Sequence, residues 1–122
     1  MLFDTRYFWA VFTSRDQQTT NKLRDLFDRS KSPCTSAITI YEVSKLALAN
    51  EGKDVANLRV GTIKRDFNVV DVDSDVAEEG ALISHRLRIP MADALIMATS
   101  KRLHLPCVTD DPHFSEVKTI WI

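Results

Sequence analysis

Four acidic side chains are widely separated in the sequence, and each follows a predicted strand or opens a predicted helix: Asp4, Glu42, Asp93 and Asp111. If the fold gathers them, the carboxylates repel one another, and at least one holds a proton unless a cation neutralises the group. Mg²⁺ and Mn²⁺ take oxygen ligands of this kind, whereas zinc sites usually include His or Cys. Such a site is suited to phosphodiester hydrolysis, because the metal lowers the pKa of a bound water and offsets charge on the phosphate.

Each acid also has an explanation that involves no site. Asp4 is suited to cap a short helix, Glu42 completes a capping-box pattern that starts at Thr39, and Asp111 lies in a turn-forming Asp-Asp-Pro segment. An acid such as Asp93 is favourable near the positive end of a helix. Its neighbours are Ala, Met and Leu, however, and an unpaired buried carboxylate is costly, so Asp93 favours a functional interpretation.

Apolar residues at two different spacings predict strands that alternate with helices. Short apolar runs predict strands over residues 1–4, 34–37, 67–70, 105–109 and 117–122. Helical spacing predicts helices over residues 16–29, 38–50, 74–86 and 90–103. A further, more polar helix is expected after residue 52 and to about residue 65. Ser74 is expected to cap one of these helices and Pro90 to open the next. Strands joined through helices favour a mostly parallel sheet covered on both faces, which is an α/β fold.

This arrangement predicts where the acids lie. In an open α/β sheet, ligands bind beyond the carboxyl ends of the strands. Asp4 ends the first predicted strand, Asp111 follows the fourth, and Glu42 lies in the first helical turn after the second. Asp93 lies in the opening turn of the last helix. We therefore expect the four acids to converge on one edge of the sheet.

The composition fits one ordinary domain, and we expect residues 1–122 to form a single one. The formal net charge is -1, with 44% hydrophobic and 27% charged residues, as in many globular domains. No apolar run approaches the ~18 residues that cross a bilayer, and Asp4 interrupts what would be the apolar part of a signal peptide. Cys34 and Cys107 are too few for a disulfide framework. A reduced, cytoplasmic setting without membrane contact is expected.

Four segments resemble, in order, the acidic motifs of PIN-domain ribonucleases. Residues 3–6 (Phe-Asp-Thr-Arg) and 35–43 resemble the first two motifs, residues 89–98 the third, and residues 109–114 the fourth. In the fourth motif the family usually has Thr, a variable residue, Asp, two more residues and Phe. The resemblance covers nearly the whole chain, and its length is most similar to the VapC-type toxins of bacterial and archaeal toxin–antitoxin pairs.

The resemblance implies a PIN-like three-layer α/β/α sandwich with a central parallel sheet of about five strands. It implies Mg²⁺- or Mn²⁺-dependent endonucleolytic cleavage of single-stranded RNA. Asp4 and Asp93 are then the principal metal ligands, and Glu42 and Asp111 complete the catalytic pocket directly or through water. Thr109 is expected to hydrogen-bond within the site. A homodimer and a small antitoxin, which covers the acidic groove with a basic side chain entering it, are the implied partners.

One position departs from the family pattern. Many members have Asn or Ser after Asp-Thr, where this chain has Arg6. A guanidinium there is able to pair with a site carboxylate or with the scissile phosphate, or to point away. The variable place of the fourth motif is held by Asp110. We interpret His113, close to that motif, as a surface-turn histidine, and the aromatic residues after Asp4 as core or dimer contacts.

Three alternatives remain open at this point. A PIN protein of RNA processing would have no antitoxin. A receiver-type phosphoacceptor domain is also small and α/β, and it needs several acids after the first strand and a Lys near the last one; Asp4 stands alone, although Lys118 is present. An inactive binding module would keep the fold without the chemistry.

Overall fold

The computed structural model describes residues 1–122 and contains a five-stranded sheet in which every pairing is parallel. The strands lie in the order β3-β2-β1-β4-β5. They are β1 (Leu2–Phe3), β2 (Cys34–Ser36), β3 (Asn68–Val70), β4 (Cys107–Thr109) and β5 (Thr119–Trp121). The α/β class and the parallel sheet of about five strands are confirmed.

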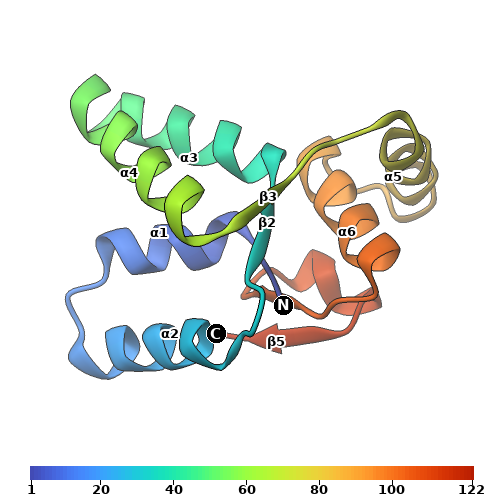
Figure 1. Cartoon of the computed structure of the whole chain (residues 1–122). Coiled ribbons are helices and arrows are strands. Elements are labelled where there is room, and N and C mark those ends of the chain that lie inside the picture. Colours follow the sequence, from blue (N-terminus) through green and yellow to red (C-terminus); the bar gives the residue numbers. More distant parts are fainter.

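Helices connect the strands and cover both faces of the sheet. They are α1 (Thr5–Thr13), α2 (Gln17–Arg29), α3 (Ala37–Asn50), α4 (Lys53–Asp66), α5 (Ser74–Leu87), α6 (Met91–Leu103) and the 3₁₀ helix η1 (Pro112–Glu116). Figure 1 shows α1 to α4 on one side of the sheet and α5 and α6 on the other, which gives the three expected layers. None of the helices combines the length and apolar composition that a bilayer span requires.

Neighbouring residues of the two central strands supply two separate cores, because side chains along a strand alternate between its faces. Leu2 of β1 and Cys107 of β4 pack with residues of α5 and α6. Phe3 and Val108, the next residues, pack with residues of α1 to α4. All four side chains are fully buried. Burial on both faces explains why these strands are continuous apolar runs.

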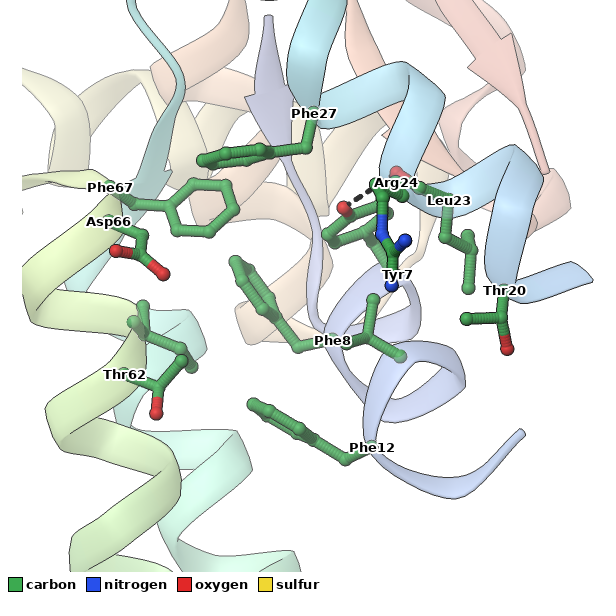
Figure 2. A pocket seen from close by; sticks show the side chains of 12 residues that line it. Tyr7, Phe8, Phe12, Thr20, Leu23, Arg24, Phe27, Thr62, Asp66 and Phe67 are labelled. Atoms are coloured by element: carbon green, nitrogen blue, oxygen red, sulfur yellow. Dashed lines mark hydrogen bonds between the residues drawn. The ribbon is translucent and has the colours of Figure 1, made fainter. Parts of the chain in front are cut away.

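Aromatic side chains fill the core beneath α1, α2 and α4. Tyr7 and Phe8 are buried. The ring centroids of Phe3 and Tyr7 lie 4.6 Å apart, and those of Phe8 and Phe67 lie 4.8 Å apart, both in edge-to-face geometry. Tyr7, Phe8, Phe12 and Phe67 also line an apolar groove among these three helices (Figure 2). The expectation that the aromatic cluster packs in the core is confirmed for Tyr7 and Phe8.

The cap of α5 and the first residue of α6 each differ from the prediction by one position. Asp73, and not Ser74, caps α5, since its carboxylate accepts a hydrogen bond from the Val76 amide at 2.9 Å. Pro90 is the residue before α6 and not its first residue. Asp and Ser are both good caps, so adjacent candidates are not separated by residue type alone.

The fourth strand begins two residues later than predicted, because Leu105 closes α6 instead of joining the sheet. The Leu105 amide donates to the Ser100 carbonyl at 3.1 Å, and the Leu105 carbonyl accepts from the Ser100 hydroxyl at 2.6 Å. These bonds satisfy groups at the end of the helix that have no intrahelical partner.

Candidate active site

The order of the strands creates a site at one edge of the sheet. The chain places β2 and β3 on one side of β1, and β4 and β5 on the other. At such a switch point the connections on either side diverge and leave a crevice beyond the carboxyl ends of the strands. Asp4 directly follows β1, and Asp110 and Asp111 follow β4. The predicted convergence of these two strand ends is therefore observed.

Asp4 is the most deeply buried of the four acids. It is 2% exposed and stands at the N-cap position of α1, but its side chain makes no capping hydrogen bond. One carboxylate oxygen, Oδ2, instead accepts a hydrogen bond from the Thr109 hydroxyl at 2.8 Å. Asp4 is therefore the N-cap residue of a helix that begins at Thr5, as the alternative explanation expected, but its carboxylate bonds to Thr109 and not to the helix amides.

Burial raises the pKa of Asp4 from its ordinary 3.8 to about 6. The hydrogen bond from Thr109 acts in the opposite direction, and the nearby charges of Asp93 and Glu42 raise the pKa further. A carboxylate in this position is unfavourable as a lone anion and becomes favourable beside a cation.

Thr109 connects the ends of β1 and β4 through a single hydroxyl group. Its Oγ1 donates to Asp4 Oδ2 and accepts from the Asp111 amide at 3.0 Å. The side chain is fully buried. Thr109 thus hydrogen-bonds within the acid cluster, as expected, and fixes the orientation of the Asp4 carboxylate.

Replacing Thr109 by Val should lower the free energy of unfolding by about 2 kcal/mol, because it leaves a buried acceptor on Asp4 and the Asp111 amide without a partner. Thr109→Ser keeps the hydroxyl and is the matched control. Urea unfolding of both variants in EDTA measures the difference. Equal stability of the Val and Ser variants would contradict the bridging role.

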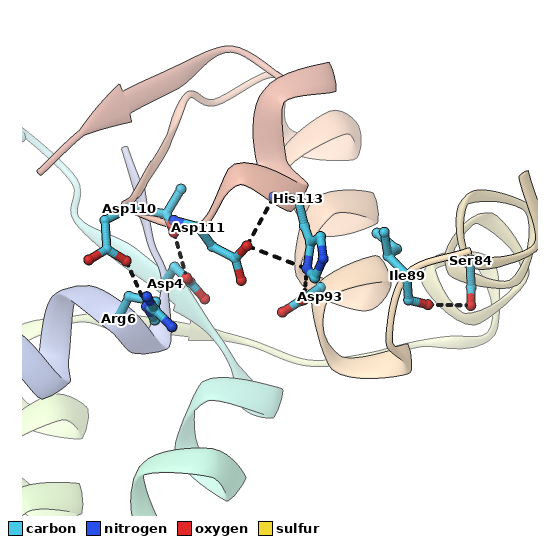
Figure 3. A network of polar contacts seen from close by, with 9 residues as sticks. Asp4, Arg6, Ser84, Ile89, Asp93, Asp110, Asp111 and His113 are labelled. Carbon is cyan, nitrogen blue, oxygen red and sulfur yellow. Dashed lines mark hydrogen bonds and ion pairs between the residues drawn. The ribbon is translucent and has the colours of Figure 1, made fainter. Parts of the chain in front are cut away.

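The turn between α5 and α6 positions Asp93. Arg88 ends α5 in the left-handed conformation, with φ 55°, and the Ser84 hydroxyl donates to the Ile89 carbonyl at 2.9 Å. Pro90 then leads into α6, so that Asp93 lies in its first turn. The side chain points toward the carboxyl end of β4 (Figure 3).

Asp93 and Asp111 meet on either side of His113. The His113 Nδ1 atom lies 2.8 Å from Asp93 Oδ2 and 3.4 Å from Asp111 Oδ1 (Figure 3). The hydrogen bond to Asp93, followed by the charge of Asp111, raises the pKa of the imidazole. Asp111 also caps η1, since its Oδ1 accepts from the His113 amide at 2.9 Å. The turn explanation of Asp111 is correct, and the same carboxylate faces the site.

Glu42 is held by a residue that the capping-box pattern did not indicate. α3 is capped by Ser36, whose hydroxyl accepts from the Ile38 amide at 3.0 Å, so Thr39 lies inside the helix and the pattern is wrong. The Glu42 Oε1 atom accepts from the Thr5 hydroxyl at 2.6 Å. This bond brings Glu42 close to Asp4, whose pKa its charge raises.

Arg6 pairs with the acid in the variable place of the fourth motif. Its Nε donates to Asp110 Oδ1 at 2.6 Å, and both side chains are about half exposed. The guanidinium therefore lies beside the acid pocket without occupying it (Figure 3).

His113 belongs to this site, although its sequence context predicted only a surface-turn histidine. His113 is two residues after Asp111, and only the short η1 helix turns its ring back toward Asp93. The order Asp111-Pro112-His113 could have indicated this position. An Asp that caps the following turn brings the residue two positions later close to the carboxylate of that Asp.

The side chains present fit a divalent cation. One ligand atom each from Asp93, Asp111 and His113 lies within 4.8 Å of the other two. Asp4, with its raised pKa, adds a buried carboxylate that a cation would stabilise. Carboxylate oxygens suit Mg²⁺ and Mn²⁺, and an imidazole nitrogen suits divalent transition metals.

Lys118 does not lie with the acids. It directly precedes β5, and its carbonyl accepts from the amide of Cys107, the first residue of β4. It is therefore at the amino edge of the parallel sheet, opposite to the acid cluster. A receiver-type site, which needs its Lys beside its acids, is not supported.

Comparison with known protein families gives a match over nearly the whole chain. The family model described as PIN domain matches residues 1–120. No curated protein sequence matches the chain.

Solved structures with a similar fold include three toxin or toxin–antitoxin proteins. The VapC20 toxin of Mycobacterium tuberculosis, named as a sarcin–ricin loop cleaving toxin, has a TM-score of 0.78 at 19% identity, over 98% of this chain and 95% of its own. VapBC2 of Rickettsia felis, bound to a promoter DNA fragment, has 0.78 at 14% identity, over 99% and 96%. A toxin–antitoxin complex from Klebsiella pneumoniae has 0.72 at 23% identity, over 93% and 89%. At these identities the likeness is one of fold.

Proposed function

This chain belongs to the PIN domain family, and on that basis we propose that it is a Mg²⁺- or Mn²⁺-dependent endoribonuclease, the toxin of a type II toxin–antitoxin pair. PIN domains are nucleases, and the proposed substrate class is single-stranded RNA. The proposed setting is the cytoplasm, where such RNA is present.

The observation that carries the proposal is the meeting of acids from distant segments at the switch point of the sheet. Asp4, Asp93 and Asp111 come from the end of β1, the start of α6 and the turn after β4. Such a concentration of negative charge is unfavourable unless it binds a cation. Its presence is explained by a metal-dependent reaction.

Each side chain then has a proposed role. Asp4 and Asp93 hold the metal, and Asp111 and Glu42 complete the pocket directly or through water. The bound metal supplies an activated water and offsets the charge on the scissile phosphate. Thr109 holds Asp4 in place, and Thr5 holds Glu42 through their hydrogen bond.

Cleavage of a labelled, unstructured RNA tests the proposal. The purified chain is incubated with the RNA in Mn²⁺, in Mg²⁺ and in EDTA. We expect cuts with either metal and none in EDTA. Cuts that persist in EDTA, or the absence of cuts on a broad panel of unstructured RNAs by folded and metal-loaded protein, would count against it.

Arg6 is proposed to contact the phosphate backbone of the RNA beside the cleavage site. The pair with Asp110 is half exposed, so its contribution to stability is small. Release of Arg6 from Asp110 therefore costs little when a phosphate is available. A guanidinium also binds phosphate oxygens in a fixed geometry.

Replacing Arg6 by Ala should weaken RNA binding roughly 5-fold, with thermal stability nearly unchanged, because one exposed ionic contact contributes about 1 kcal/mol. The slope of log affinity against log salt concentration should fall by about 0.7, the value for one single-strand phosphate contact. Fluorescence anisotropy in EDTA measures both. Arg102→Ala removes an arginine that pairs with Asp75 and serves as the control. Unchanged binding and slope in Arg6→Ala would exclude the contact.

Two partners are proposed with the function. A small antitoxin would cover the acid pocket and insert a basic side chain, to which the clustered carboxylates are electrostatically complementary.

A second copy of the chain is proposed because large apolar side chains are exposed on α3, α5 and α6. The most exposed of them are Tyr41, Leu48, Leu82 and Met91. Light scattering of the purified chain tests the homodimer.

A further inference from the structure

His113 lies where a ligand of the proposed metal would lie. Adjacent ligands of one octahedral ion with bonds of 2.1 Å are about 3 Å apart. The distances from His113 Nδ1 to Asp93 Oδ2 and Asp111 Oδ1 are 2.8 and 3.4 Å. The nitrogen therefore lies at the spacing of a neighbouring ligand from each oxygen, and an ion bound there would displace the Nδ1 proton that now hydrogen-bonds to Asp93.

The backbone of His113 is fixed on both sides, so the ring does not depend on the metal for its position. On one side the His113 amide donates to the Asp111 carboxylate at 2.9 Å. On the other side Phe114 is fully buried, and its carbonyl accepts from the Thr119 hydroxyl at 2.9 Å. This anchoring presents the imidazole to the acids before any ion binds, which lowers the entropic cost of coordination.

We propose that His113 is a nitrogen ligand of the bound cation and that it makes the site prefer Mn²⁺ to Mg²⁺. The inference rests on the proposed function, because it assigns a further ligand to the same site. Mg²⁺ is bound through oxygen and keeps most of its waters. Imidazole instead suits the divalent transition metals, whose affinity for nitrogen exceeds that of Mg²⁺. A site with carboxylates alone lacks this source of selectivity.

The nitrogen ligand is observed directly by pulsed electron paramagnetic resonance of Mn²⁺ bound to the full chain. A coordinated imidazole produces nitrogen modulation, whereas oxygen ligands produce none. We expect the modulation in the wild type, its loss in His113→Gln, and its retention in His85→Gln and His104→Gln. The last two variants change the other histidines, which lie near or at the ends of α5 and α6.

Titration calorimetry with each metal alone measures the selectivity. His113→Gln should lower Mn²⁺ affinity by at least the roughly 10-fold that loss of an outer-shell partner of a metal site costs. Its Mg²⁺ affinity should change far less. An equal loss for both ions would show that the residue acts on the fold or on the charge of the site, and would overturn the proposal.

The outcomes separate this inference from the proposed function. If wild-type protein binds Mn²⁺ without nitrogen modulation, His113 is no ligand, and the metal-dependent nuclease still stands. If the wild type binds neither ion, both proposals fail together. The wild-type spectrum decides the matter even if His113→Gln fails to fold, since the histidines at 85 and 104 are tested separately.

Discussion

Replacing Asp93 by Asn should lower metal-dependent RNA cleavage roughly 1000-fold, as does the loss of a preorganised charge-stabilising group in other enzymes. The substitution keeps the size of the side chain and an oxygen that accepts from His113, but it removes the negative charge that holds the cation. The folded state should keep nearly the same stability, because the weaker attraction to His113 is offset by the decreased repulsion among the clustered carboxylates. Initial cleavage rates in Mn²⁺ and thermal unfolding monitored by circular dichroism measure the two effects.

Asp75→Asn is the matched control for this variant. Asp75 also lies in the first turn of a helix, α5, but its partner is Arg102 at 3.5 Å, and it belongs to no acid cluster. The Asp75→Asn variant should cleave RNA at the wild-type rate. Equal activity of Asp93→Asn and wild type would point to a contaminating nuclease, and loss of folding in Asp93→Asn would assign the residue a structural role.

The fold and the meeting place of the acids were predictable from the sequence, because both follow from local patterns. Short apolar runs separated by helical periodicity predict a parallel sheet, and the carboxyl ends of parallel strands lie at one edge. Asp4 directly follows β1 and Asp111 is the second residue after β4, so their proximity depends only on the order of the strands. Asp93 needed one further step, since the turn after α5 determines where α6 begins.

The hydrogen-bond partners within the site were not predictable, because they depend on side-chain directions between distant elements. Glu42 was assigned to Thr39 by spacing, whereas the fold pairs it with Thr5, from another helix. Arg6 meets Asp110, which is 104 positions away in the sequence. Only the three-dimensional arrangement of α1, α3 and the turn after β4 distinguishes these partners from the local ones.

The burial that makes Asp4 favourable beside a cation also means that its charge destabilises the folded protein when no metal is bound. We expect Asp4→Asn to raise the free energy of unfolding at pH 7.5 in EDTA by up to about 3 kcal/mol. This value follows from the rise of the Asp4 pKa from 3.8 to about 6, because each pKa unit corresponds to 1.36 kcal/mol. Asn keeps an oxygen that accepts from the Thr109 hydroxyl, so the removed charge is the main change. Urea unfolding of both proteins measures the difference.

The stability difference between Asp4→Asn and the wild type should depend on pH. Between pH 4 and 6 the folded wild type binds more protons than the unfolded chain, because its Asp4 pKa is raised, so the stability of the wild type falls as pH rises through that window. Asn does not titrate. The advantage of Asp4→Asn should therefore be smallest below pH 4, grow through the window and stay constant above pH 6.

Mn²⁺ should reverse the order of stability. Binding to the folded state stabilises the wild type by an amount that increases with metal concentration. Asp4→Asn lacks the charge that the cation neutralises and should gain much less. A variant that is less stable than the wild type in EDTA at pH 7.5 would mean that the Asp4 carboxylate stabilises the fold without metal. The clustered acids would then be explained without a bound cation, and they would no longer support the proposed metal-dependent nuclease.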